Sequence, residues 1–308
     1  MELSQIKSKT NYEICGKENL QVKGIAYASN ATEDDIAIAR NKREIQLTKA
    51  DVVLTRPLFC PTEKTLMYSY ERLETAAVRI ARLMIKEGIY EDYEQPVKYR
   101  EFIPGVLAGK NVELGEGTVI GVNTVIGNNV RIGKRVIIEP NVFLGSGVCL
   151  EDDVIVRSGA RIGAPAFYHY WEHRLNTFVG VGTVKIGAGV EIGCNTIIQR
   201  GTFSDTEIGK ETKIGNLVDV GHDVVIGKNC KIVSQVGIAG NAVIGEQVMI
   251  YGQVGIANDV VIGKGSIIYG KSSVTKNVRP GQKIAGEGQE RAEYLRMQAW
   301  IRNMFFRR

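Results

Sequence analysis

Residues 208–244 read IGKETKIGNLVDVGHDVVIGKNCKIVSQVGIAGNAVI, and in this stretch an aliphatic side chain returns at every sixth position. The series begins at Ile208 and continues without a slip to Ile244. A period of six fits neither an α-helix, which repeats every 3.6 residues, nor a long strand, which alternates with a period of two. It is typical of a parallel β-helix, in which every unit is a short strand followed by a turn.

The same phase extends over most of the chain beyond residue 113. It runs from Leu114 to Ile162, returns at Ile186, and continues from Ile208 to Val274. With three hexads in each triangular coil, residues eighteen apart should stack one above the other. An ordinary antiparallel β-domain would not hold a six-residue phase over so many units. The sequence therefore predicts a solenoid.

Interruptions and flanking regions divide the chain. GAPAFYHYWEHRLNTF opens an insert at 163–183 that must loop out of a β-helix spanning 103–280, and RGTFSDTE at 200–207 breaks the phase again. Residues 1–102 combine short strand-like stretches with an amphipathic helix pattern, SYERLETAAVRIARLMIKEG, so we predict a small α/β domain there. Residues 281–308 read as a helical tail, which we expect to cap the solenoid.

Composition narrows the functional classes. Among 308 residues 44% are hydrophobic, enough for a substantial core, and no apolar run is long enough to span a membrane. The start, MELSQIKSKTNYEICG, lacks the apolar centre of a signal peptide, so we expect a cytoplasmic protein. Five cysteines form no CxxC pair and should be reduced thiols. The net charge of +5 is mild, and nucleic acid is not an expected partner.

His222 is one of only three histidines in the chain. It stands two places after the aliphatic Val220, which puts it at a corner of the solenoid and facing outward. Asp219 and Asp223 flank it, and a nearby carboxylate can orient an imidazole that acts as a general base. Gly240 lies eighteen residues on, where a bare backbone N–H could bind an oxyanion. The alternative is an ordinary solvated corner residue.

A near-duplicate pair, SQVGIAGN and GQVGIAND, should stack Gly237 beside Gly255 and Gln235 beside Gln253. Small residues in adjacent coils would form a groove for a slender chain. Asn216 and Asp219 are expected to line the corner column of His222.

The stretch from Val190 to Gly263, with its VDVGHDVVIG and SQVGIAGNAVIG motifs, closely resembles the core of the UDP-3-O-acylglucosamine N-acyltransferases of the lipid A pathway. These enzymes place a hydroxyacyl chain on an amino sugar. The resemblance implies a left-handed β-helix, an N-terminal nucleotide-sugar-binding domain, a C-terminal helical tail and a homotrimer with active sites between subunits. It also implies that His222 is the general base and that the Gly240 amide is the oxyanion donor. With these roles, the groove should hold the pantetheine arm of an acyl donor, contacted by Gly237, Gln253, Gly255 and Asn258. Asn216 and Asp219 should touch the sugar substrate.

Several positions depart from that family. The family usually has IAHN where this chain has VGHD; the His-Asp order resembles the related lipid A O-acyltransferase and the nucleotide-sugar N-acetyltransferases, which favours Asp223 as the residue that orients His222. Asp259 replaces a second family histidine. In DDIAIARNKRE, Ile38 and Glu44 replace the two aromatics that stack on uracil. Arg40 and Asn41 remain candidates for nucleotide contact, the alternative being a solvated loop.

Other residues offer competing chemistry. A spacing of four between His169 and His173 would suit a metal if the insert were helical. The hexapeptide carbonic anhydrases bind a metal through three histidines between subunits and are therefore a competing resemblance. That family needs a further histidine where this chain has Gly227, so no metal is predicted. The aromatics of the insert, Phe167, Tyr168, Tyr170 and Trp171, are expected to wall the substrate cleft of a neighbouring subunit. Among the cysteines Cys149, Cys194 and Cys230, the last should fill the core rather than act as a nucleophile.

The tail, QERAEYLRMQAWIRNMFFRR, mixes five arginines with aromatic residues. It would either dock an acidic acyl carrier protein or a membrane surface, or pack on the solenoid or on trimer mates. Coenzyme A also remains open as the donor, and no tightly bound cofactor is expected. The sequence thus predicts an N-acyltransferase that moves an acyl group, a 3-hydroxyacyl group by the resemblance, from a pantetheine thioester to a nucleotide-linked amino sugar. Two alternatives are an acyl-CoA-dependent enzyme for a dTDP-amino-dideoxy sugar and a non-catalytic trimeric scaffold.

Overall fold

The computed structural model describes the whole chain except residues 11, 58–62, 287–288 and 307–308. The chain divides into two compact units. The first comprises residues 1–95 together with 167–181 and 202–204. The second, which contains the hexads, comprises residues 96–166, 182–201 and 205–308.

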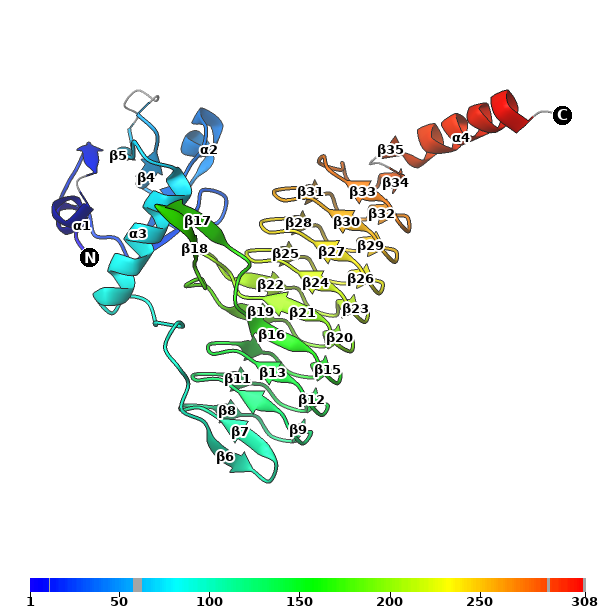
Figure 1. The fold of residues 1–308 in the computed structure, drawn as a ribbon, viewed down its shortest axis with the longest axis horizontal. Coiled ribbons are helices and arrows are strands. Elements are labelled where there is room, and N and C mark those ends of the chain that lie inside the picture. The colour runs from blue at the N-terminus through cyan, green and yellow to red at the C-terminus, as the bar shows by residue number, and fades with distance from the viewer. Residues whose placement is uncertain (11, 58–62, 287–288, 307–308) are drawn as a thin grey trace. The chain divides into compact units, whose positions relative to one another are not determined.

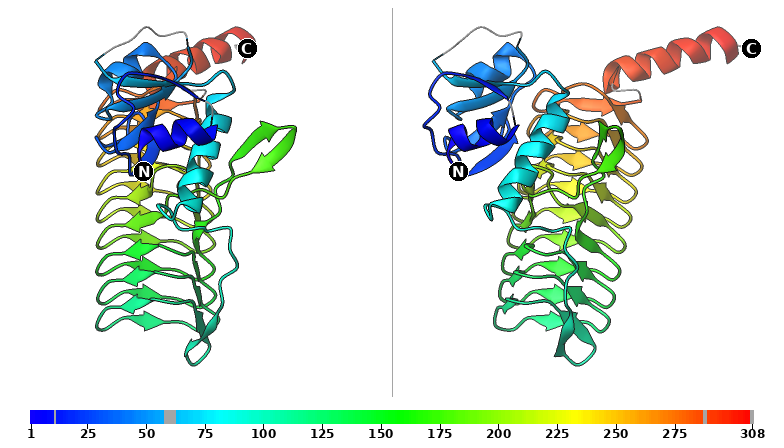
Figure 2. Two further views of the ribbon diagram at one scale, coloured as in Figure 1. Left: turned by 90° about the vertical axis from the view of Figure 1, so that its left-hand side faces the viewer. Right: turned by 60° about the vertical axis from the view of Figure 1, so that its left-hand side comes forward.

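The second unit is a parallel β-helix whose short strands stack into three sheets (Figures 1 and 2). We call these sheets face I, face II and face III in the order in which the chain visits them. Face I consists of β7 (Val106–Ala108), β10 (Val125–Ile126), β13 (Phe143–Leu144), β16 (Arg161–Ala164), β21 (Ile197–Gln199), β24 (Asp219–Val220), β27 (Gly237–Ile238), β30 (Gly255–Ile256) and β33 (Ser273–Val274).

Face II consists of β8 (Glu113–Leu114), β11 (Arg131–Ile132), β14 (Cys149–Leu150), β19 (Val184–Ile186), β22 (Thr206–Ile208), β25 (Val225–Ile226), β28 (Val243–Ile244) and β31 (Val261–Ile262). Face III consists of β9 (Val119–Ile120), β12 (Ile137–Ile138), β15 (Ile155–Val156), β20 (Glu191–Ile192), β23 (Lys213–Ile214), β26 (Lys231–Ile232), β29 (Met249–Ile250), β32 (Ile267–Ile268) and β34 (Lys283–Ala285). Antiparallel strands lie at two ends of these sheets: β6 (Arg100–Ile103) beside β7, and β35 (Gln289–Glu290) beside β34.

The register confirms the β-helix predicted from the hexads. Val125 pairs with Phe143 and Gly237 pairs with Gly255, so residues eighteen apart are neighbours in a sheet. The hexad aliphatics point inward and form one continuous core; Ile126 and Ile262, for example, are completely buried. Each turn places a residue in the left-handed region, often Asn or Asp, which tolerate that conformation best among residues with a side chain.

Both interruptions of the hexads lie at one corner, between face I and face II. Arg161 pairs with Ile197 rather than with residue 179, so the first insertion adds 18 residues to its coil. Ile197 pairs with Asp219 rather than with residue 215, so the second adds 4. We call this the I–II corner and name the other two corners, II–III and III–I, in the same way.

The longer insertion forms a β-hairpin of β17 (His169–Glu172) and β18 (Arg174–Thr177), which belongs to the first unit. His169 lies in a strand and His173 in the hairpin turn, with a φ of 60°, so the helical spacing that would have suited a metal does not exist. Among the described residues no group of three or more His, Cys, Asp or Glu side chains is placed to hold a metal ion.

The hairpin packs on the N-terminal part of its own unit. Arg79 forms an ion pair with Glu172, and the Arg82 guanidinium lies 5.6 Å from the centre of the Tyr170 ring. Tyr168 and Tyr170 are buried in this way, which corrects the expectation that they wall a neighbour's cleft. The other two aromatics of the insert remain exposed: Phe167 by 79% and Trp171 by 57%.

The N-terminal part of the first unit is a five-stranded sheet with three helices, which confirms the predicted α/β architecture. The strand order is β1 (Glu13–Cys15), β5 (Thr65–Tyr68), β4 (Val52–Thr55), β3 (Asp35–Ile38) and β2 (Gly24–Tyr27), and only β1 is antiparallel to its neighbour. The helices are α1 (Leu3–Thr10), α2 (Lys42–Leu47) and α3 (Leu73–Lys86). The buried side of α3 includes Ala76, Ala77 and Ile80, as its amphipathic pattern predicts.

The tail is helical, as predicted, over α4 (Arg291–Phe306). It does not cap the solenoid through its apolar side chains, because Leu295, Trp300 and Phe305 are 46%, 61% and 70% exposed. Arg307 and Arg308, which contribute to the basic character of the tail, lie outside the described residues. In the part of the chain that the structure describes, no helix combines the length and the apolar character needed to cross a bilayer.

Candidate active site

His222 occupies the I–II corner between β24 and β25, where the sequence placed it. Its Nδ1 lies 2.7 Å from Oδ2 of Asp223. The Asp223 carboxylate is completely buried, and only 10% of the His222 side chain is exposed. The alternative of a solvated corner residue is therefore wrong.

A second contact fixes the carboxylate. Asp223 adopts a φ of 59°, and its backbone N–H donates to Oγ1 of Thr206 at 3.0 Å. Thr206 is fully buried and begins β22, directly after the four-residue insertion. Because Asp223 holds Nδ1, we expect proton exchange with a substrate to take place at Nε2. No sequence pattern singled out Thr206, apart from its place in the phase break.

Gly240 lies one coil beyond His222 and packs directly against its ring. A Cβ at Gly240 would lie 2.5 Å from Cε1 and 2.6 Å from Nε2 of His222. The backbone of Gly240 is outside the left-handed region, so space rather than conformation requires glycine here. The predicted juxtaposition of the two residues is correct.

The Gly240 amide has no side-chain cap. At some other corner positions a polar side chain one coil further on caps the backbone N–H: Asn128 N–H donates to Ser146 Oγ at 3.0 Å, and Lys134 N–H donates to Asp152 Oδ1 at 2.8 Å. One coil beyond Gly240, the Asn258 side chain instead donates through Nδ2 to the Gly240 carbonyl at 3.4 Å. No residue that the structure describes accepts a hydrogen bond from the Gly240 N–H. An uncapped N–H next to an imidazole suits an oxyanion.

The two residues predicted to touch the sugar do not share the corner of His222. Asp219 lies in β24 on the outer side of face I, and its Oδ1 accepts from Gln199 Nε2 at 3.2 Å. Asn216 lies at the III–I corner, at the opposite edge of that face, where its Oδ1 caps the Cys194 N–H at 2.8 Å. The expectation of one shared column is wrong because residues six apart belong to successive corners.

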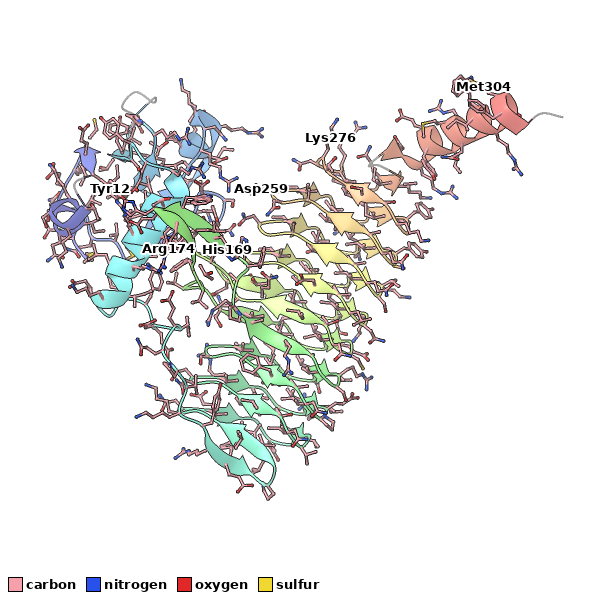
Figure 3. All side chains as sticks on the ribbon, viewed as in Figure 1. Tyr12, His169, Arg174, Asp259, Lys276 and Met304 are labelled. Carbon is pink, nitrogen blue, oxygen red and sulfur yellow. The ribbon has the colours of Figure 1, made fainter. Side chains whose placement is uncertain are left out.

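The residues predicted to hold the acyl donor span face I from edge to edge. Gly237 and Gly255 pair in the middle, and a Cβ at either would meet no atom within 4 Å. Gln253, at the III–I corner, donates from Nε2 to Gln235 Oε1 at 2.8 Å. Asn258 lies at the I–II corner, one coil beyond Gly240. Asp259, next to it, stacks two coils beyond Asp223 (Figure 3). The predicted contacts with a donor remain predictions.

The two nucleotide candidates lie in the first unit, after β3. Asn41 caps α2: its Oδ1 accepts from Glu44 N–H at 3.0 Å, and its Nδ2 donates to Glu44 Oε1 at 2.6 Å. Asn41 therefore has a structural role as the cap of α2 and is not part of a merely solvated loop. The Arg40 guanidinium lies 5.5 Å from the centre of the Tyr27 ring, at the carboxyl ends of parallel strands, where α/β sheets bind ligands.

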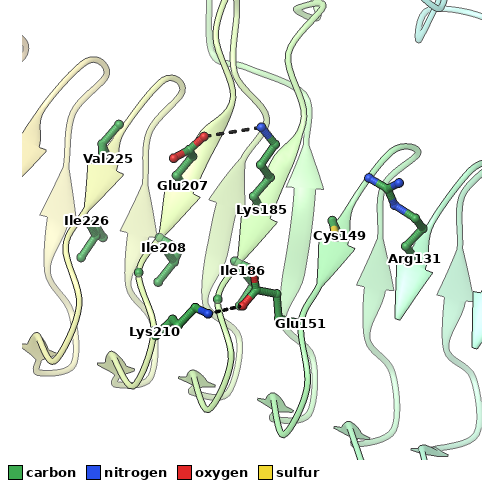
Figure 4. A pocket seen from close by; sticks show the side chains of 12 residues that line it. Arg131, Cys149, Glu151, Lys185, Ile186, Glu207, Ile208, Lys210, Val225 and Ile226 are labelled. Atoms are coloured by element: carbon green, nitrogen blue, oxygen red, sulfur yellow. Dashed lines mark ion pairs between the residues drawn. The ribbon is translucent and has the colours of Figure 1, made fainter. Parts of the chain in front are cut away.

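Face II carries a shallow groove of about 300 Å³ that the sequence did not indicate (Figure 4). Its charged side chains are largely paired, with Lys185 3.6 Å from Glu207 and Lys210 3.4 Å from Glu151. Cys149 lies in this groove, and Cys230 is buried under the II–III corner. Neither thiol lies at the corner of His222, and the burial of Cys230 confirms the prediction that it fills the core.

Comparison with known proteins agrees with this geometry. The family model "Bacterial transferase hexapeptide (six repeats)" matches residues 111–146 and 205–240. The solved UDP-N-acetylglucosamine acyltransferase of Francisella novicida shares the fold, with a TM-score of 0.57 and 23% identity over 64% of this chain and 72% of that one. The UDP-N-acetylglucosamine O-acyltransferase of Moraxella catarrhalis gives a TM-score of 0.54 and 25% identity over 64% of this chain and 77% of that one.

Two curated relatives carry the same name, UDP-3-O-acylglucosamine N-acyltransferase. The Rhizobium rhizogenes protein is 48% identical over only 68 residues, which is 22% of this chain and 19% of that protein. The Helicobacter pylori protein is 34% identical over 243 residues, which is 73% of this chain and 70% of that protein. By this extended match the chain belongs to the UDP-3-O-acylglucosamine N-acyltransferase family.

Proposed function

We propose that this protein is an N-acyltransferase that moves an acyl group from a pantetheine thioester to the amine of a nucleotide-linked amino sugar. The observation that carries the proposal is the buried pair of His222 and Asp223 packed against the uncapped amide of Gly240. A general base and an oxyanion donor within one small corner are the two groups that transfer from a thioester to an amine requires.

The chemistry follows from these contacts. As the amine attacks the thioester carbonyl, Nε2 of His222 accepts the amine proton, while Asp223 holds Nδ1. The Gly240 N–H stabilises the tetrahedral oxyanion. When the intermediate collapses, the carbon–sulfur bond breaks and His222 returns the proton to the leaving thiolate. The base contributes about 10²–10⁴-fold and the oxyanion donor about 3–4 kcal/mol.

Face I supports a binding site for the donor arm. The open floor over Gly237 and Gly255 leads to Gly240, with Gln253 and Asn258 at its two edges. Asp219, on the same face, is the sugar contact that this arrangement favours, and Arg40 is a nucleotide contact. The donor is an acyl carrier protein or coenzyme A thioester, and no tightly bound cofactor is involved. By its family, we infer a cytoplasmic homotrimer in lipid A biosynthesis.

A second candidate differs in substrate rather than in chemistry. Ile38 is buried in β3, and both carboxylate oxygens of Glu44 are bonded within the α2 cap. Neither residue is placed to stack on a base, which favours a nucleotide other than uridine. The alternative is therefore an acyl-CoA-dependent N-acyltransferase for a dTDP-amino-dideoxy sugar.

The experiment that tests the proposal is thiol release by the purified protein. UDP- and dTDP-linked amino sugars are combined in turn with hydroxyacyl carrier protein and with acyl-CoA, and wild type is run beside His222→Ala. Turnover with a UDP-linked sugar that the mutation abolishes supports the first candidate, and turnover only with a dTDP-linked sugar supports the second. If no donor reacts, or if the mutation costs tenfold or less, the assigned base is wrong and a non-catalytic trimeric scaffold gains support.

A further inference from the structure

The chain returns from the first unit to the β-helix twice at the I–II corner. Thr183 directly precedes β19, and Asp205 directly precedes β22. The two strands are neighbours in face II, and β22 in turn pairs with β25, which follows the turn of His222 and Asp223. The second return therefore lies one coil before the proposed catalytic pair.

The Asp205 carboxylate joins the two returns. Its Oδ1 accepts from the backbone N–H of Thr183 at 2.7 Å, and its Oδ2 lies 2.6 Å from Nζ of Lys185. The Thr183 carbonyl in turn accepts from the backbone N–H of Thr206 at 2.9 Å. Hydrogen bonds to a carboxylate are about twice as strong as bonds between neutral groups, so Asp205 holds the backbone of both returns in place.

These bonds continue into the proposed catalytic turn. Thr206 Oγ1 accepts from the amide of Asp223 at 3.0 Å, and Asp223 holds Nδ1 of His222 at 2.7 Å. A continuous series of hydrogen bonds thus runs from Asp205 through Thr183 and Thr206 to the turn of the imidazole. Because Thr206 can hold the Asp223 amide only if its own backbone is fixed, the carboxylate of Asp205 acts on the turn from one coil away.

Asp152, at the II–III corner, makes the same two kinds of contact. Its Oδ1 accepts from the backbone N–H of Lys134 at 2.8 Å, and its Oδ2 lies 3.8 Å from Nη2 of Arg135. None of the proposed catalytic residues lies at that corner. The two aspartates are therefore a matched pair: both support a coil, but only Asp205 supports the coil beneath the His222 turn.

We propose that Asp205 is a positioning residue of the acyltransferase, which fixes the returning chain so that Thr206 holds His222 and Asp223 in their reactive arrangement. This inference rests on the proposed function and adds a residue to its site. Loss of the carboxylate would let the turn shift and move the imidazole relative to the amine. A misplacement of about 1 Å can cost about 10²-fold in rate, even when the substituted residue does not touch the substrate.

Three substitutions at Asp205 separate its position from its charge. Asp205→Ala removes both contacts and should lower kcat about tenfold at an unchanged KM for donor and acceptor. Asp205→Asn keeps an oxygen for the Thr183 N–H and should retain the wild-type kcat. Asp205→Glu keeps the charge but displaces the carboxylate by one methylene, so it should lose as much as the alanine variant. Asp152→Ala, the matched control, should keep the wild-type kcat.

Hydrogen exchange tests the inference without a substrate. The Asp223 amide, which donates to Thr206, should exchange about tenfold faster in Asp205→Ala and Asp205→Glu than in wild type, because its acceptor is no longer fixed. It should exchange at the wild-type rate in Asp205→Asn and in Asp152→Ala. If Asp205→Ala does not fold, the comparison of Asp205→Asn with Asp205→Glu still tests the inference.

The possible results separate this inference from the proposed function. A wild-type kcat in Asp205→Ala, or equal losses in Asp205→Asn and Asp205→Glu, would overturn the inference while leaving the acyltransferase intact. A raised KM at an unchanged kcat would also overturn it, because Asp205 would then act on substrate binding. If wild type transfers no acyl group, the proposed function fails, and an unchanged exchange rate of the Asp223 amide would still overturn the role of Asp205.

Discussion

The I–II and II–III corners of the β-helix are built from the same hexads but differ in every respect that matters for chemistry. At the II–III corner the coils are regular, and ion pairs such as Lys264 with Glu246 at 3.0 Å lie exposed. Such surface pairs contribute at most about 1 kcal/mol each. The I–II corner holds both insertions and a buried His–Asp pair that packs against Gly240.

The difference shows how a repetitive fold acquires a site. Because the hexads fix the backbone at every corner, a functional site requires only a local change in the regular pattern of side chains. Here the exceptions are a glycine that admits a ring and an insertion that brings in Thr206. The predictions below test whether matched positions at the two corners respond differently.

The largest effect is expected at His222. His222→Ala should lower kcat by about 10²–10⁴-fold, because the general base is lost. Lys228 occupies the same place in its hexad at the II–III corner, so Lys228→Ala is the matched control and should keep wild-type activity. Steady-state kinetics of both variants check this, with circular dichroism to verify the fold. Comparable losses in the two variants would remove the distinction between the corners.

Gly240→Ala should come next. The added methyl would lie 2.5 Å from Cε1 of His222, so the ring must move and kcat should fall about 10²-fold, with a cost of about 1–3 kcal/mol in stability. Gly237→Ala, where the methyl meets no atom within 4 Å, should keep the wild-type Tm and act on the KM for the donor. Thermal unfolding and steady-state kinetics of Gly240→Ala and Gly237→Ala test this prediction. An active Gly240→Ala enzyme would argue against the packed ring as the catalytic arrangement.

Asp223→Asn should reduce kcat by about ten- to a hundredfold. Asparagine tolerates the left-handed conformation of this residue, so the turn is kept while the charge that holds His222 Nδ1 is lost. The control is Asn229→Asp, at the same hexad place of the II–III corner, where φ is 57°. Activity should change only in the first variant. An unchanged kcat for Asp223→Asn would show that His222 does not need the Asp223 carboxylate for catalysis.

Two threonines allow a finer comparison. Thr206 Oγ1 accepts from the amide of Asp223, and Thr212 Oγ1 accepts from the amide of Cys230, both at 3.0 Å. Thr206→Val and Thr212→Val should each cost about 1–2 kcal/mol of unfolding free energy. Only Thr206→Val should also lower kcat, by a few-fold, because it loosens the turn of Asp223. Chemical denaturation and kinetics measure the two effects, and equal kcat values would make Thr206 purely structural.

The smallest effect concerns Cys230, the inward residue that follows the II–III corner. Burial raises the pKa of its thiol above the ordinary value, so the folded protein binds this proton more tightly than the unfolded chain does. Stability from this group is therefore present at neutral pH and declines as pH rises through the ordinary thiol range near about 8.5. Cys230→Ala should flatten that alkaline decline in denaturant titrations. An identical slope in both proteins would contradict this.

Much of the fold could be predicted from the sequence because a six-residue period fixes which side chains point inward. Residues eighteen apart stack in adjacent coils because three hexads make one coil. This rule correctly predicted that His222 contacts Gly240. The hexad phase alone could not show at which corner Asn216 lies, because that phase is identical at all three corners. The three corners are distinguished only by the eighteen-residue period of a complete coil.

Burial of the site was harder to predict. A polar corner residue has the same pattern whether it is solvated or covered, so the sequence could not show that the Asp223 carboxylate is completely buried. Whether a side chain caps a backbone amide depends on the direction of that side chain, which the six-residue period does not determine. The insert could be recognised as a loop, but its packing on α3 depends on contacts such as Arg79 with Glu172 that join distant segments.

The two strands that reverse direction, β6 beside β7 and β35 beside β34, bear on solubility. A stack of parallel coils ends in unpaired backbone groups that would accept another coil and could grow into a fibre. An antiparallel strand at the edge offers a different hydrogen-bond pattern from the parallel one that propagates the coils. Each reversal covers one face of the β-helix, face I beside β7 and face III beside β34, and so reduces the parallel edge that is open to a further coil.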